Sequence, residues 1–150
     1  MKATYRVLAY LIVLEVFVQA AAIAFAVFGL TKWIDDGNTL DKAAVEDEST
    51  TFTGLVGFII HGINGQLVFP LIVIIFLIVS FFAKVRGGIG LAVFILVAVA
   101  AQIALGIFAH EIPALGLLHG INALLILGAA VTAGQRATTV KPSARSAETV

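Results

Sequence analysis

The chain has 150 residues, of which 61% are hydrophobic and 12% are charged, and its formal net charge is zero. A soluble domain usually carries about 25% charged residues, so this composition predicts a single domain embedded in a lipid bilayer. A neutral chain has no overall attraction to nucleic acid, and a chain without cysteine cannot form disulfides, thiolate metal sites or iron–sulfur clusters.

Four apolar stretches follow one another along the chain, and each is long enough to span a bilayer as a helix, which takes roughly 20 residues. The first starts like a secretory signal, but its apolar run continues to Leu30, which favours a membrane span. We expect Pro70 to kink the second stretch, because proline lacks a backbone N–H. The predicted spans cover residues 5–30, 53–83, 89–109 and 114–133.

Backbone groups in lipid must be paired within a helix, so the predicted fold is an all-α, integral membrane four-helix bundle over residues 1–136. Residues 31–52 form a mostly acidic loop between the first two spans. Residues 137–150 are small and polar with scattered charges, and we expect them to be a disordered cytoplasmic tail.

The basic residues predict how the bundle is oriented. The loop 31–52 is mostly acidic and the connection "HEIP" at 110–113 has no lysine or arginine. Positive residues stay on the cytoplasmic side, so we expect a multi-pass protein of the cell membrane with both termini in the cytoplasm. Basic residues lie before the first span, between the second and third spans and after the fourth span: Lys2, Arg6, Lys84, Arg86, Arg136, Lys141 and Arg145.

The sequence "HGIN" occurs twice, at residues 61–64 and 119–122, inside the second and fourth spans. The preceding spans can also be aligned, "VQAAAIAFA" over "AQIALGIFA", which pairs Gln19 with Gln102. Together the two matches predict a bundle built from two repeated helical hairpins, related by an axis normal to the membrane.

Both histidines are expected roughly 9–12 Å below the outer ends of their helices, at one level and facing across that axis. Gly57 and Gly65 share the face of His61, and Gly116 lies one turn before His119. Small residues leave room for a planar porphyrin. We therefore predict a b-type haem with His61 and His119 as its iron ligands and these glycines around it. Two histidine ligands leave no open position on the iron, which favours a cytochrome-like electron carrier over an enzyme.

A second interpretation needs no cofactor. Small residues spaced four apart are common helix-packing surfaces in membranes. The chain would then be an accessory subunit of a larger respiratory-type complex, or a homo-oligomer. Glu15, four residues before Gln19, could carry protons, bind a quinone headgroup or pack protonated against another helix. His110 and Glu111 are expected at the membrane interface rather than in a ligand site.

The stretch "AAQIALGIFAHEIPALGLLHGINALLILG" resembles one four-helix half of haem A synthase. That family has a Q-x-x-L-G stretch in the third helix, matched by Gln102, Leu105 and Gly106, and a histidine early in the fourth, matched by His119. His61 matches the histidine of its second helix. The chain is also similar to small actinobacterial four-helix membrane proteins of unknown function with two such histidines. The resemblance implies that both histidines ligate one b-type haem. Because the chain has half the length of the enzyme and no outer-loop cysteines, we do not expect it to make haem A by itself.

Overall fold

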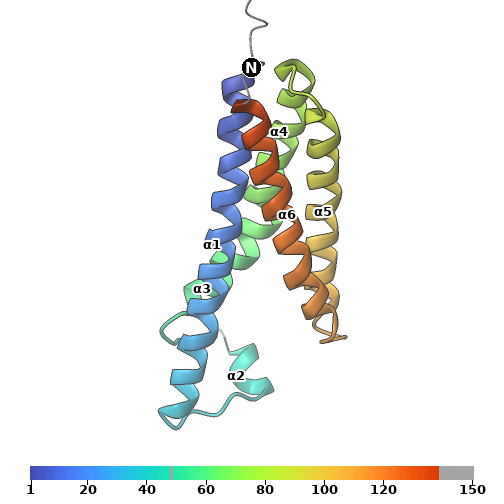
Figure 1. Ribbon diagram of the computed structural model, residues 1–150. Coiled ribbons are helices and arrows are strands. Elements are labelled where there is room, and N and C mark those ends of the chain that lie inside the picture. The colour runs from blue at the N-terminus through green and yellow to red at the C-terminus, as the bar shows by residue number, and fades with distance from the viewer. Residues whose placement is uncertain (48, 139–150) are drawn as a thin grey trace, which may run out of the picture.

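The structure, a computed structural model, describes residues 1–47 and 49–138 and contains only helices and their connections within them (Figure 1). A short π-helical turn, η1 (Asn64–Val68), joins the two halves of the second span. The helices are α1 (Lys2–Asp35), α2 (Lys42–Glu46), α3 (Leu55–Ile63), α4 (Phe69–Ala83), α5 (Gly88–Phe108) and α6 (Leu115–Thr138).

Four helical units are long and apolar enough to cross a membrane: α1, the continuous unit α3–η1–α4, α5 and α6. Many of their large apolar side chains lie on the surface, such as Phe28 and Leu117, which are 75% and 74% exposed. Such a surface is stable against lipid and costly in water. The prediction of an all-α bundle of four membrane-spanning helices is confirmed.

The helices differ from the predicted spans mainly at their ends. α1 continues to Asp35 and α2 forms inside the stretch 31–52, which the sequence predicts as a loop. α6 continues to Thr138, beyond the start of the predicted tail, and residues 139–150 lie outside the described part of the chain. Pro70 is the second residue of α4, directly after η1, and its missing N–H removes one hydrogen bond from the continuous ladder at this junction.

Each of the four spanning units packs mainly against two neighbours. α1 packs against α6 and against the α3–α4 unit, and α5 packs against α4 and α6. The α3–α4 unit and α6 therefore lie diagonally across the bundle. The start of α1, the end of α6 and the α4–α5 connection share one end, here called the terminal end (Figure 1). The opposite end, here called the loop end, carries residues 36–47, 49–54 and 109–114.

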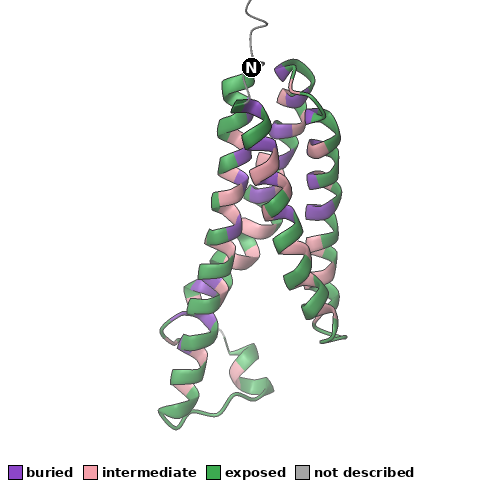
Figure 2. Cartoon of the chain, viewed as in Figure 1, coloured by how far each residue is buried: buried purple, intermediate pink, exposed green. Residues whose placement is uncertain are grey.

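The buried core fills the half of the bundle nearest the terminal end, whereas exposed residues dominate the other half (Figure 2). Tyr5 and Phe76 pack there with ring centroids 4.5 Å apart, and the Tyr5 hydroxyl donates to the Gly88 carbonyl at 3.3 Å. The core ends at Val16, Phe69, Val99 and Ile126. Fewer side chains are buried between this level and the loop end, and this part is here called the less filled half of the bundle.

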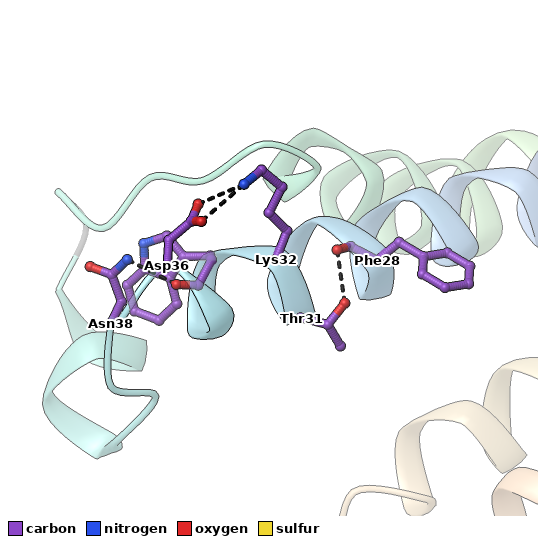
Figure 3. Close-up of polar contacts among 6 residues, drawn as sticks. Phe28, Thr31, Lys32, Asp36 and Asn38 are labelled. Carbon is purple, nitrogen blue, oxygen red and sulfur yellow. Dashed lines mark hydrogen bonds and ion pairs between the residues drawn. The ribbon is translucent and has the colours of Figure 1, made fainter.

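The loop end of α1 is held by local polar contacts (Figure 3). Lys32 pairs with Asp36 at 2.9 Å, and the Thr31 hydroxyl donates to the Phe28 carbonyl at 2.9 Å. Asn38 donates from Nδ2 to the Trp33 carbonyl, also at 2.9 Å. These contacts pair backbone and side-chain groups in the last turns of α1, beyond its apolar run.

α1 and α3 approach each other closely through glycine. Gly54 adopts a φ of +103°, and a side chain there would meet the Phe25 carbonyl of α1. A Cβ on Gly57 would collide with the Ala22 carbonyl and contact Ala26. The loop-end half of the first hairpin is therefore a tight backbone-to-backbone contact.

Candidate functional site

The two histidines of the "HGIN" sequences lie side by side in the bundle. The rings of His61 in α3 and His119 in α6 have centroids 6.2 Å apart and planes inclined by 53°. They lie on diagonal helices, just beyond the level where the core ends at Phe69 and Ile126. Both residues are half-buried. The pair thus lies at the boundary between the buried core and the less filled half of the bundle.

His119 is oriented by the helix that precedes it. Its Nδ1 lies 3.0 Å from the backbone carbonyl oxygen of Gln102. A carbonyl only accepts, so Nδ1 carries the proton and Nε2 keeps its lone pair. Asn122 anchors the same turn, because its Nδ2 donates to Gln102 Oε1 at 2.7 Å and to the Ala98 carbonyl at 2.8 Å.

His61 has the matching contact in the first hairpin, where its Nδ1 lies 3.1 Å from the backbone carbonyl of Gln19. The Gln19 side-chain nitrogen also lies 2.9 Å from the same Nδ1 when that amide is oriented to satisfy its other neighbours. The two contacts demand opposite tautomers. We assign Nδ1 as the donor to the carbonyl, because the carbonyl cannot donate and because His119 makes the same bond. The Gln19 nitrogen therefore makes no hydrogen bond to the ring and donates to the His61 carbonyl instead.

The Gln19 amide also explains the π-helical turn. In the same orientation its nitrogen donates to the His61 carbonyl at 3.0 Å, and its oxygen accepts from the Gly65 N–H at 3.0 Å and from Asn64 Nδ2 at 2.9 Å. His61 and Gly65 are four residues apart, the spacing of an α-helical hydrogen bond. A side chain inserted into that ladder widens the helix. Gln19 therefore fixes the backbone directly after His61.

The candidate glycines fall into different environments. Gly65 faces the Gln19 amide, whose nearest terminal atom would lie 3.2 Å from an added Cβ. Gly116 has nothing within 4 Å of that position, and neither has Gly62. Gly57 faces α1 instead, because the hairpin partner lies against this side of α3. The structure thus places Gly65 near the His61 turn, Gly116 beside open space and Gly57 in a helix contact.

Gly106 belongs to the site and was not among the predicted ligand-site residues. A Cβ on Gly106 would lie 3.2 Å from His119 Cε1 and 3.3 Å from Nδ1. The imidazole therefore rests directly on this glycine of α5. The sequence signal was present in the Q-x-x-L-G stretch, which places Gly106 one turn after Gln102, whose carbonyl bonds the same ring.

Glu15 approaches the site from α1. Its carboxyl oxygen Oε2 accepts from Asn64 Nδ2 at 2.6 Å. The residue aligned with Glu15 in the second hairpin is Ala98, whose backbone carbonyl accepts from Asn122 in the same manner. The first hairpin thus has a carboxyl group where the second has only backbone.

His110 and Glu111 are exposed in the turn after α5. In the described part of the chain, no three or more His, Asp or Glu side chains gather into a group that could hold a metal ion by itself. Two imidazoles would be enough for the iron of a porphyrin, because the porphyrin supplies the remaining ligands and needs only axial ones from the protein.

Comparison of the chain with protein-family models, with curated proteins and with solved structures finds no match.

Proposed function

We propose that this protein is a membrane b-type haem protein that transfers electrons, with His61 and His119 as the two axial ligands. The observation that carries the proposal is the separation of the two rings, 6.2 Å between centroids. Two imidazoles that bind one metal ion through nitrogen at about 2 Å have ring centres roughly 6 Å apart. No hydrogen bond engages either Nε2 within the described residues, so both lone pairs are available.

The hydrogen bonds at Nδ1 support the same assignment. A histidine that binds a metal through Nε2 usually donates its other ring N–H to a carbonyl or carboxylate, which fixes the ring and raises its basicity. The carbonyls of Gln19 and Gln102 would serve the two ligands in this way. The resemblance to haem A synthase rests partly on Gln102, Gly106 and His119, and the first two of these residues both lie against the His119 ring.

The surroundings suit a flat apolar group. The pair lies at the level where the buried core ends, and Gly62 and Gly116 leave open space beside their helices. The haem would supply one-electron redox chemistry, exchanging electrons with a quinone or a partner subunit. The chain's own residues hold both imidazoles in place and surround them with apolar helices.

The contacts of the two hairpins support an internal repeat. In each, a histidine Nδ1 bonds the carbonyl of the aligned glutamine, and an asparagine three residues later bonds back to the preceding helix. We propose that the hairpins are duplicates with both termini in the cytoplasm. Five basic residues at the terminal end support that orientation: Lys2, Arg6, Lys84, Arg86 and Arg136.

A second candidate is a cofactor-free accessory subunit. Gly116 and Gly120 in α6 favour it, because neither has an atom within 4 Å of an added Cβ. Exposed small residues at this spacing let a partner helix approach closely.

A visible spectrum of the purified protein separates the two. An intense Soret band with sharp α and β bands on reduction is expected for the haem protein. A colourless preparation from haem-replete cells would refute the haem proposal and support the accessory role.

A further inference from the structure

An open groove runs between α1 and α3 next to the histidine site. It has a volume of about 390 Å³, within the range of small-molecule sites. Its walls are apolar, and its polar groups are the Glu15 carboxyl and the Asn64 amide. The lining residues are Glu15, Val18, Ile59, Ile60, Ile63, Asn64 and Val68.

The fold does not need a carboxyl group at this place. In the second hairpin Asn122 is satisfied by the carbonyl of Ala98 and the side chain of Gln102. Asn64 could be satisfied in the same way if residue 15 were alanine. A carboxyl group in a membrane helix is costly, and such residues usually mark a functional site.

The carboxyl has hydrogen-bonding capacity left for a ligand. Oε2 accepts from Asn64, whereas no described group donates to Oε1. Glu15 also lies about 20 Å along α1 from Lys2, at 1.5 Å per residue. That depth is too great for a phospholipid headgroup at the terminal end, and a phosphate would be repelled by a carboxylate. The matching ligand is an apolar ring with polar substituents that is dissolved in the lipid.

We propose that this groove binds the headgroup of a membrane quinone, with Glu15 as its polar contact. Ionised, the carboxyl would accept from a quinol hydroxyl; protonated, it would donate to a quinone carbonyl. Ile60 and Asn64 line the groove and flank His61 in sequence, so the quinone would lie beside one proposed iron ligand. The inference rests on the proposed electron-transfer function, because it locates the quinone exchange of that function.

The test is photolabelling of the purified protein in nanodiscs with a short-chain azido-benzoquinone, followed by peptide mapping. We expect label on the segments around Glu15 and Ile60. Glu15→Ala, which copies Ala98, should fold and reduce labelling about tenfold or more, in line with a lost hydrogen bond to a charged group. Glu111→Ala is the control carboxyl.

A matched pair of groove-filling variants tests the position. Val68 lines this groove, whereas Leu67 lines a neighbouring groove that shares Ile59 and Ile63 with it but contains neither Glu15 nor Asn64, and both side chains are exposed. Val68→Trp should abolish the labelling and Leu67→Trp should not. Labelling that ignores both Glu15→Ala and Val68→Trp would overturn the inference. The inference would also be overturned if Glu15→Ala changed the oligomeric mass and left the labelling unchanged. That result would show that Glu15 contacts a partner helix.

The haem spectrum of the same samples keeps the two proposals distinguishable. Label on the groove in a protein without haem bands would support the groove and refute the haem function. Haem bands in a protein without label on the groove would refute the quinone site and leave the haem proposal standing.

Discussion

Gly106 lies directly against the His119 ring, so close that an added Cβ would stand 3.2 Å from Cε1. This contact and the hydrogen bond from Nδ1 to the Gln102 carbonyl fix the imidazole from two sides. The position of one proposed iron ligand is therefore set by α5, a helix that contributes no ligand of its own.

Gly106→Leu should displace the His119 ring while the bundle still folds, because the level of the site lies beyond the buried core. We expect haem content to fall several-fold, with the remaining haem partly high-spin, since a shifted imidazole binds iron poorly. The ratio of Soret to protein absorbance measures this. Gly128→Leu, at a glycine of α6 with open space around it, is the control. Equal haem content in both variants would contradict the role assigned to Gly106.

Gly57→Ala should destabilise the fold rather than empty the site. Its Cβ would collide with the Ala22 carbonyl, and overpacking of this kind typically costs about 1–3 kcal/mol. Gly62→Ala, where an added Cβ meets nothing within 4 Å, should leave the melting temperature within a degree or two. Thermal unfolding in detergent compares the two. A Gly57→Ala protein as stable as the Gly62→Ala protein would show that α1 and α3 do not pack as described.

Gln19→Leu should weaken the turn after His61. The His61 carbonyl and the Gly65 N–H would lose the amide that bridges them, at a cost of about 1–3 kcal/mol for unsatisfied polar groups. Gln66→Leu, in the same turn but exposed, should have little effect. Hydrogen exchange at the Gly65 amide is the direct measurement, and it should rise in Gln19→Leu alone. Unchanged exchange would mean that the α3–α4 ladder does not depend on Gln19.

The orientation of the bundle can be read by cysteine labelling, because the chain has no cysteine of its own. Asp41→Cys at the loop end should react with an impermeant maleimide added outside intact cells. Thr4→Cys at the terminal end should react only after the membrane is opened, since basic residues favour the cytoplasmic side and the proposed topology places that end there. The reverse pattern would invert the proposed topology and place the histidine pair near the cytoplasmic side.

The four helices could be predicted from the sequence because each backbone N–H and C=O in lipid must be hydrogen-bonded within its own span, which requires a helix. The third predicted span, 89–109, differs from Gly88–Phe108 by a single residue at each end. The matching Nδ1 contacts of His61 and His119 agree with the repeated "HGIN", and the duplication itself stays a prediction. In contrast, the widened turn at Asn64–Val68 depends on the Gln19 side chain from another helix, and no local pattern encodes it.

The neighbours of the glycines could not be predicted from the sequence either. Gly57 and Gly65 lie four residues either side of His61, yet one packs on α1 and the other on the Gln19 amide. A helix face defined by spacing alone does not reveal which neighbour covers it, because that depends on how the hairpin closes. The backbone carbonyls that orient both imidazoles could not be predicted either, since every residue type has one.

The central claim is that His61 and His119 bind one haem iron together, and axial-ligand substitution tests it most directly. The parent protein should be low-spin and resist carbon monoxide, because both axial positions are filled. His61→Ala and His119→Ala should each lose haem, or become high-spin and bind carbon monoxide, whereas the exposed His110→Ala should match the parent. The measurement is the reduced visible spectrum with and without carbon monoxide. An unchanged low-spin spectrum in both His61→Ala and His119→Ala, or bleaching by His110→Ala alone, would contradict the account.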